Sequence, residues 1–173
     1  EIVVTNSHDG RSAFKFHVGL VRLVCSNGLV IADQSFGKYS IMHKGLKESH
    51  ISNTVDKLTC EIPSVVDRVK EMMSISMDSG QRIKFGKEAV ERRWEDGRTI
   101  NLDQLLAINR SADKENNLWT VFNRVQEKLI TGGLDTSRKS GVKTIHNKTR
   151  AVRSIDENLR INKMLWALSE SYL

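Results

Sequence analysis

Apolar and polar residues alternate in the first part of the chain with a period of two, as they do in strands. Residues Ile2 to Thr5 and Ala13 to Cys25 are rich in β-forming side chains, and turn formers at Asn6 to Gly10 separate them. In the second run Phe14, Phe16, Val18 and Leu20 share one face, as in a strand with one face in water. The pattern predicts a β-hairpin.

Two further strands are predicted after this hairpin. The dipeptide Asn27-Gly28 is a strong turn signal, and Leu29 to Ile31 can return as a third strand. A short run from Ser35 to His43 adds an edge strand. Residues 1–45 therefore predict a small antiparallel sheet.

The period changes to that of a helix from Asn53 onward. Apolar residues between Val55 and Met73 recur at helical spacing and predict one long helix or a broken pair. Pro63 lacks a backbone donor, so we expect it to kink this element or to begin a second helix. The methionines from Met72 to Met77 are expected to fill the core.

The rest of the chain has helical patterns with recognisable ends. They predict helices over Lys84 to Trp94, from a cap at Asn101, over Asn117 to Ile130, and from about Ser154 to Tyr172. In the third of these, Leu118 and Phe122 belong to an apolar stripe, whereas Arg124, Glu127 and Lys128 are expected to turn away. Gly132-Gly133 stops that helix.

The final helix is apolar nearly all round between Met164 and Leu168. Such a helix must be buried in the domain or in a subunit interface, which makes a homo-oligomer through this helix one expectation. Thr149 to Arg153 are expected to belong to the beginning of the same helix.

Strands come first and helices follow, which favours an α+β fold. We expect a small antiparallel sheet of N-terminal hairpins packed against the C-terminal helices in a single domain over residues 1–173. Residues 1–45 are mainly strands, and 50–173 are mainly helices with a basic loop at 134–153. The chain begins at Glu1 without Met, so we expect native N-terminal sequence to precede it.

The composition is that of a soluble globular protein, with 39% hydrophobic and 28% charged residues. No apolar run approaches the roughly 18 residues of a membrane span, and we expect a cytoplasmic protein that does not meet a membrane. Cys25 and Cys60 stand alone on apolar patterns and are expected to be small buried hydrophobes, without a disulfide, metal or cofactor.

Positive charge is concentrated in one segment. Thr136 to Arg153 carries six cationic side chains and no acid, which equals the formal net charge of +6 for the whole chain. We expect a mobile basic loop that meets a polyanion, and the alternative is a solvated loop whose cations aid solubility. The candidate phosphate contacts are Arg138, Lys139, Lys143, Lys148, Arg150 and Arg153.

Two further features extend this basic surface. Arg92 and Arg93 precede Trp94, and Lys15, Lys38 and Lys44 lie on or beside the polar side of the predicted hairpin. A basic sheet face beside a basic loop would form a groove for nucleic acid. Because aromatic residues make up only 6% of the chain, we expect backbone binding without sequence readout.

No catalytic motif is present in the sequence. There is no nucleophile elbow, P-loop or glycine-rich dinucleotide turn. His8-Asp9 is a pair that can hold a metal in a phosphohydrolase, but turn chemistry explains these residues without one. The sequence therefore does not predict an enzyme.

Several segments resemble the family called domain of unknown function 932, which is encoded by phages and plasmids. They are NSHDG at Asn6 to Gly10, RLVCSNGL at Arg22 to Leu29, LWTVFNRVQEKLI at Leu118 to Ile130, and the segment from Thr149 to Trp166. The motif residues are Asn6, His8, Asp9, Arg22 and Asn27. Arg22 lies on the apolar register of its strand, where it either pairs with Asp9 or contacts a ligand.

This resemblance implies a role in replication, recombination or counter-defence. The predicted sheet, helices and basic groove are similar in outline to single-strand annealing proteins of the Rad52 type, an analogy at the level of fold. The main hypothesis is a non-enzymatic protein that binds nucleic acid, most of all single-stranded DNA, and anneals strands as a homo-oligomer. The alternatives are an interaction protein that blocks a host factor, and a metal-dependent nuclease that uses His8 and Asp9.

Overall fold

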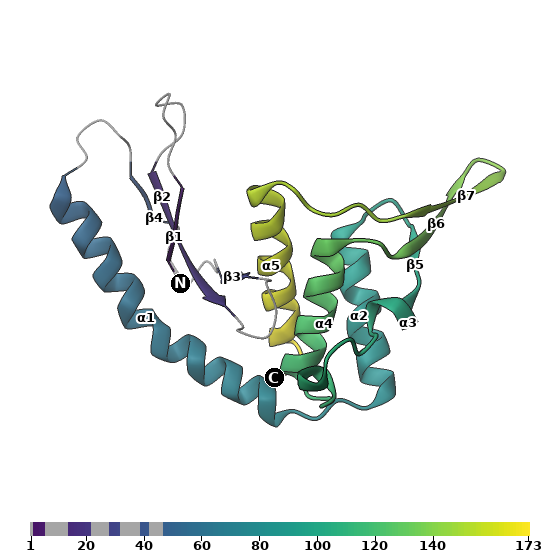
Figure 1. Cartoon of the computed structure of the whole chain (residues 1–173), viewed down its shortest axis with the longest axis horizontal. Coiled ribbons are helices and arrows are strands. Elements are labelled where there is room, and N and C mark those ends of the chain that lie inside the picture. Colours follow the sequence, from purple (N-terminus) through teal and green to yellow (C-terminus); the bar gives the residue numbers. More distant parts are fainter. Residues whose placement is uncertain (1, 6–13, 22–27, 32–38, 42–46) are drawn as a thin grey trace. The chain divides into compact units, whose positions relative to one another are not determined.

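A computed structural model describes residues 2–5, 14–21, 28–31, 39–41 and 47–173 (Figure 1). The chain divides into two compact units, Glu1–Arg68 and Val69–Leu173. The motif residues Asn6, His8, Asp9, Arg22 and Asn27 lie outside the described residues, as do Cys25, Lys38 and Lys44.

The first unit contains an antiparallel sheet built around β2. Strand β2 (Phe14–Val21) pairs with β1 (Ile2–Thr5), β3 (Gly28–Ile31) and β4 (Tyr39–Ile41). In the register, Ile2 lies opposite Val18, Val21 opposite Gly28 and Phe16 opposite Tyr39. The predicted strands are present in this unit.

Helix α1 (Glu48–Ser74) follows the sheet and contains Pro63 in its interior. The helix continues through this residue, so the prediction of a second helix that begins there is wrong. Cys60 is exposed on α1, which corrects the expectation of a buried thiol. Its apolar neighbour Ile62 is two positions away, and residues at that spacing do not share a helix face.

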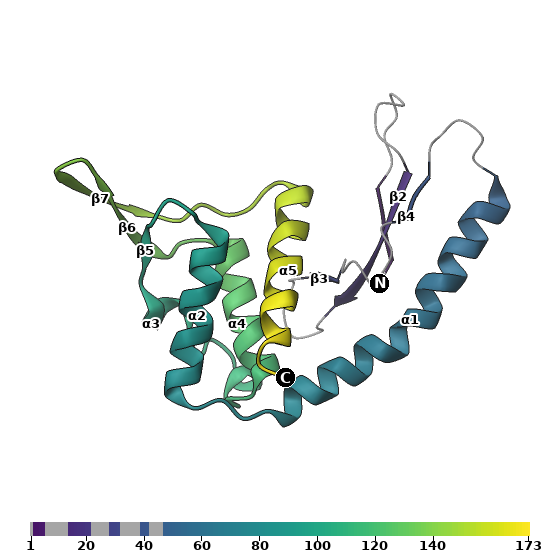
Figure 2. The same cartoon turned by 180° about the vertical axis from the view of Figure 1, so that it is seen from behind.

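Three helices form the body of the second unit, α2 (Ser79–Arg93), α4 (Leu118–Thr131) and α5 (Ile155–Glu170), and lie side by side (Figure 2). Two short helices, α3 (Leu102–Leu105) and η1 (Ser111–Asp113), connect α2 to α4. Helix α2 begins earlier than predicted because Asp78 and Gln81 form a reciprocal capping box, with both hydrogen bonds at 2.8 Å. Among the described residues no helix is long and apolar enough to cross a membrane.

Side chains from α2, α4 and α5 meet in one core. Phe85, Phe122 and Leu165 are fully buried, and the rings of Phe122 and Trp166 meet edge to face at 6.3 Å. Burying side chains of this kind stabilises the fold by about 2 kcal/mol each. Most of the apolar side chains of α5 are buried in this core. The composition of the helix therefore no longer predicts a subunit interface.

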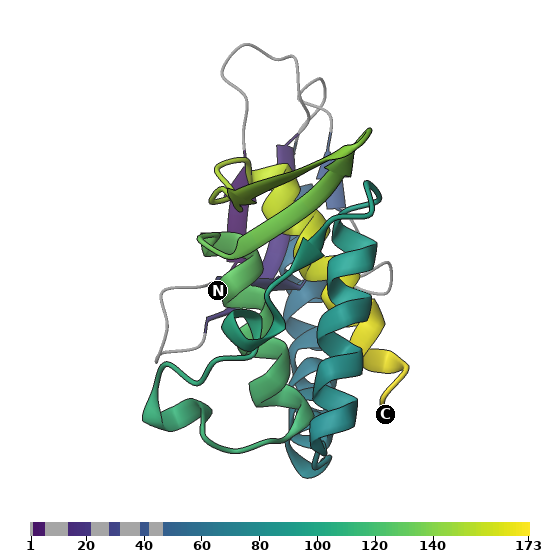
Figure 3. The same ribbon diagram turned by 90° about the vertical axis from the view of Figure 1, so that its right-hand side faces the viewer.

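A second antiparallel sheet corrects the prediction of a mobile basic loop at 134–153. Strands β6 (Asp135–Ser140) and β7 (Lys143–Lys148) form a hairpin, and β5 (Thr99–Ile100) pairs with β6. Gly141 has a φ of +61° at the first position of the two-residue turn, which a glycine adopts without strain. Figure 3 shows the hairpin near one end of α2 and α4.

Arg124 lies inside the second unit rather than on its surface, which corrects another prediction. It is 4% exposed on α4, and its guanidinium donates to the carbonyls of Asp113 and Glu115 and to Asn116 Oδ1. Helix α4 is central in this unit. The connection between α3 and α4 covers its polar face, which the sequence predicted to be exposed to water. A bidentate ion pair between Arg110 and Glu127 joins the same connection to α4.

Candidate nucleic-acid interface

A depression of about 500 Å³ lies within the second unit, between the β6–β7 hairpin and the end of α2. Its wall contains Trp94 and five cationic residues, Arg93, Arg98, Arg138, Lys148 and Arg150. Thr136, Asn147 and Thr149 add polar groups, and none of the described lining residues is acidic. We call this feature the arginine depression.

The aromatic ring of Trp94 lies among guanidinium groups. The guanidinium carbon of Arg93 is 4.3 Å from the ring centroid, and that of Arg98 is 5.1 Å away. Arginine stacks favourably on an indole because its charge meets the negative face of the ring. These contacts hold the two arginines at the wall of the depression.

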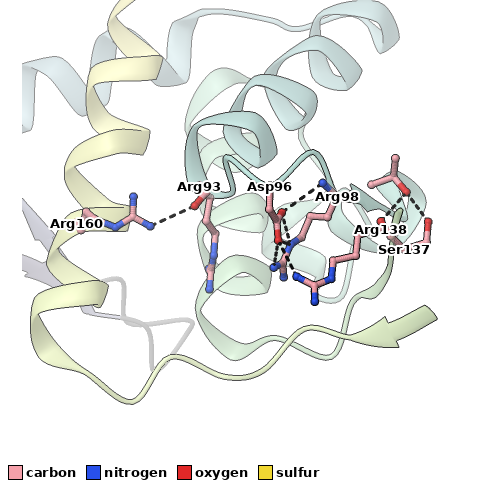
Figure 4. Close-up of polar contacts among 7 residues, drawn as sticks. Arg93, Asp96, Arg98, Ser137, Arg138 and Arg160 are labelled. Carbon is pink, nitrogen blue, oxygen red and sulfur yellow. Dashed lines mark hydrogen bonds and ion pairs between the residues drawn. The ribbon is translucent and has the colours of Figure 1, made fainter. Parts of the chain in front are cut away.

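Arg93 also links two helices. Its guanidinium donates to the carbonyl of Leu129, in the last turn of α4, where carbonyls lack helical partners. Burial lowers the pKa of Arg93 to about 10, and the group stays protonated at neutral pH. Arg160 donates to the Arg93 carbonyl at 3.4 Å (Figure 4). Arg93 is therefore held by the fold, and its charge remains beside the depression.

Asp96 holds two further arginines in place. Its carboxylate accepts hydrogen bonds from Arg98 at 2.8 and 2.5 Å and lies 3.7 Å from the guanidinium of Arg138 (Figure 4). The hydrogen bonds from Arg98 lower the pKa of Asp96 to about 2, and the charge of Arg138 adds to this effect. The carboxylate joins the turn after α2 to strand β6.

The Asp96 carboxyl should titrate near pH 2, and Arg98→Ala should raise its pKa toward the ordinary value of 3.8. Because the folded-state pKa is depressed, the stabilisation by this contact is present above pH 3.8 and fades as the pH falls toward 2. Carboxyl chemical shifts followed by NMR would measure both values. An unchanged pKa in Arg98→Ala would contradict this origin, and Arg92→Ala serves as the control.

Backbone hydrogen bonds fix the position of Arg150. The neighbouring Thr149 exchanges bonds with the chain after α4, with Gly133 N donating to Thr149 O and Thr149 N donating to Leu134 O, both at 2.8 Å. Val152 N donates to Ile130 O at 2.8 Å. Thr149 to Arg153 thus form an extended connection and not the beginning of α5, which is capped by Ser154.

Four of the eight cations predicted from the sequence lie in the arginine depression, namely Arg93, Arg138, Lys148 and Arg150. Lys139 and Lys143 lie farther out on the hairpin, and Arg153 is exposed on the connection to α5. Arg92 lines a different depression with Lys84, Glu88 and Tyr172. The structure therefore places half of the predicted cations in the arginine depression and the other half elsewhere.

Sequence reasoning missed Arg98. The dipeptide Asp96-Gly97 is a turn signal in the sequence, and a turn there brings Arg98 back beside Trp94. Gly97 has a φ of +66°, as such a turn requires.

The described residues contain no group of three or more His, Cys, Asp or Glu side chains that could hold a metal ion. His146, which is described, is exposed on β7. The region around Trp94 thus offers cations, hydroxyls and amides, a set that suits an anion with several oxygen atoms.

Comparison with known proteins places the chain in a family. The model of the domain of unknown function (DUF932) matches residues 1–166. Two proteins of Escherichia coli strain K12, UPF0380 protein YafZ and UPF0380 protein YfjQ, are each 36% identical over 178 aligned positions. The match covers all of this chain and 62% of each relative, and no solved structure matches. The chain belongs to the DUF932 family.

Proposed function

We propose that the protein binds single-stranded nucleic acid, DNA above all, through phosphate contacts in the arginine depression, and that it promotes strand annealing. A phage or plasmid origin, which the resemblance suggested, belongs to the same proposal. The observation that carries the proposal is the convergence of five cations from separate segments around one tryptophan. Asp96 and Asp135 contact three of these cations but do not line the depression, so its wall keeps a net positive charge that attracts a polyanion.

The chemistry of the wall suits phosphate. Guanidinium groups form paired hydrogen bonds with phosphate oxygens, and Arg138 and Arg150 are both exposed. The threonine and asparagine side chains of the wall can donate further bonds to phosphate or sugar. Such contacts position a strand without reading its sequence.

Trp94 favours a single strand over a duplex. Bases stack on aromatic side chains in proteins that bind single strands, and each stacked base contributes about 1–3 kcal/mol. In a duplex the base faces are covered by their neighbours, so Trp94 can stack only on an unpaired base, which would take the place of the guanidinium of Arg93 or Arg98 on the ring. One aromatic ring is consistent with weak sequence preference.

The test is a titration of a labelled single strand at several salt concentrations, with the full chain followed by fluorescence anisotropy. Arg138→Ala combined with Arg150→Ala should weaken binding about tenfold or more and reduce the salt slope by about 1.4, since two phosphate contacts disappear. The control combines Arg92→Ala with Arg153→Ala, which removes the same charge outside the depression. It should bind within about twofold of the wild type.

Two outcomes would reject the proposal. One is a wild-type protein that does not bind a single strand at low salt. The other is an equal loss in the two double variants, because binding would then follow total charge and not the depression.

A further inference from the structure

The β6–β7 hairpin separates two depressions. Arg138 and Ile145 are cross-strand partners, and both line the arginine depression. Ser137 and His146 are the adjacent partners, and they line a second depression of about 560 Å³. Because successive residues of a strand point to opposite faces, the two depressions open toward opposite faces of the ribbon at these pairs, and they adjoin at its base, where Thr136, Asn147 and Lys148 line both.

The second depression has polar walls of another kind. Thr99 Oγ1 lies 2.7 Å from Ser137 Oγ, and Asn101, His146 and Lys148 lie nearby in the same wall. Hydroxyl, amide and imidazole groups commonly contact the phosphates and sugars of nucleic acids. We call this feature the hydroxyl depression. Asp135 also lines the hydroxyl depression and reduces its positive charge, because the Asp135 carboxylate lies 3.3 Å from the ammonium of Lys148.

Both faces of the hairpin carry positive charge beyond these depressions. Lys143 lies on the same face as Arg138, and Lys139 lies on the other. The hairpin sequence has no acid from Thr136 to Lys148. A nucleic-acid strand could therefore follow either face toward the depression at its base.

The tip of the hairpin carries one exposed apolar side chain. Val142 follows the turn glycine and is 106% exposed, the largest exposure of any large apolar side chain in the described part of the chain. Six residues in each strand give the ribbon a reach of about 20 Å at the usual rise. Figure 1 shows it extending away from the helices of its own unit. Apolar side chains at such positions can insert at base steps and unstack them.

We propose that the hairpin is a pin that binds the junction between single-stranded and duplex nucleic acid. One strand follows the Arg138 face into the arginine depression, and the other follows the opposite face over the hydroxyl depression. Val142 then lies against the last base pair of the duplex. This inference rests on the proposed function and names the substrate class of the same site, a forked junction.

The experiment compares three labelled DNAs of related sequence: a single strand, a blunt duplex and a fork with two unpaired arms. The wild type should bind the fork about tenfold more tightly than the single strand, since a second strand and the tip are engaged together. Val142→Ser should reduce this preference to about twofold with unchanged affinity for the single strand. A fluorescent base analogue at the last pair should report unstacking with the wild type only.

The matched control is Ile108→Ser, which removes an exposed apolar side chain elsewhere in the same unit. It should leave the fork preference intact. Lys139→Ala with His146→Ala should weaken fork binding and spare single-strand binding, because both residues lie on the second face.

Failures of the two proposals can be told apart. Equal affinity for fork and single strand, or tightest binding to the blunt duplex, would overturn the pin while the arginine depression still binds single strands. A full fork preference in Val142→Ser would also overturn the pin. Absence of single-strand binding in the wild type would overturn both.

Discussion

Gly132→Ala should lower the free energy of unfolding of the second unit by about 3 kcal/mol, the combined effect of backbone strain and a steric clash. Gly132 ends α4 with a φ of +72°, and a Cβ there would lie 2.6 Å from the carbonyl carbon of Arg150. The colliding atoms are backbone atoms of Arg150 and Ala151, and hydrogen bonds of the flanking Thr149 and Val152 hold this stretch of chain, so the clash is not relieved by rotating a side chain. Urea denaturation followed by tryptophan fluorescence measures the loss, since all three tryptophans lie in this unit.

Gly133→Ala is the matched control for this change. Gly133 has a φ of +81°, but no atom lies within 4 Å of the position of its Cβ. It should cost only about 1 kcal/mol, the strain of a left-handed residue. Equal losses in the two variants would show that the contact with Arg150 is unimportant. Gly132→Ala should also weaken binding to a single strand, because it displaces the backbone that carries Arg150.

Arg124→Met should destabilise the same unit by about 3 kcal/mol, because it removes a buried guanidinium that donates to three acceptors, among them the carbonyl of the buried Asp113. The guanidinium of Arg124 donates to Glu115 O at 2.7 Å and to Asn116 Oδ1 at 3.3 Å, in addition to Asp113 O. Methionine fills a similar volume but donates no hydrogen bond. The loss is measured by the same urea denaturation.

Lys114→Met provides the comparison for Arg124→Met. It removes an exposed cation from the connection that Arg124 holds, and should change stability by less than about 0.5 kcal/mol. If Arg124→Met were as mild, the hydrogen bonds of this buried guanidinium would contribute little to the fold.

Local patterns predicted the elements whose ends and faces are encoded nearby in the sequence. Asn101 caps α3 and Gly132 ends α4, as the sequence indicated, and α4 begins within one residue of its predicted start. The strands β1, β2 and β3 overlap the ranges predicted for them. These features depend on side chains within a few residues of one another.

The hairpin and the buried arginine depend on contacts between distant segments. The β6–β7 segment has no apolar face of its own, so its composition indicated a loop, and pairing with β5 across about forty residues is invisible to a local pattern. Arg124 appeared polar on a helical wheel, but a connection from another part of the chain covers it. The candidate site was predicted from local clusters of cations, which found Arg93, Arg138, Lys148 and Arg150 and missed Arg98.

The most direct test of the central claim is the NMR signal of each tryptophan indole N–H during titration with a single strand. Trp94 lines the arginine depression, whereas Trp166 is 4% exposed in the core and serves as an internal reference. The account predicts that the Trp94 signal shifts with the binding curve while the Trp166 signal stays in place. Saturation with nucleic acid that leaves the Trp94 signal unmoved would contradict it.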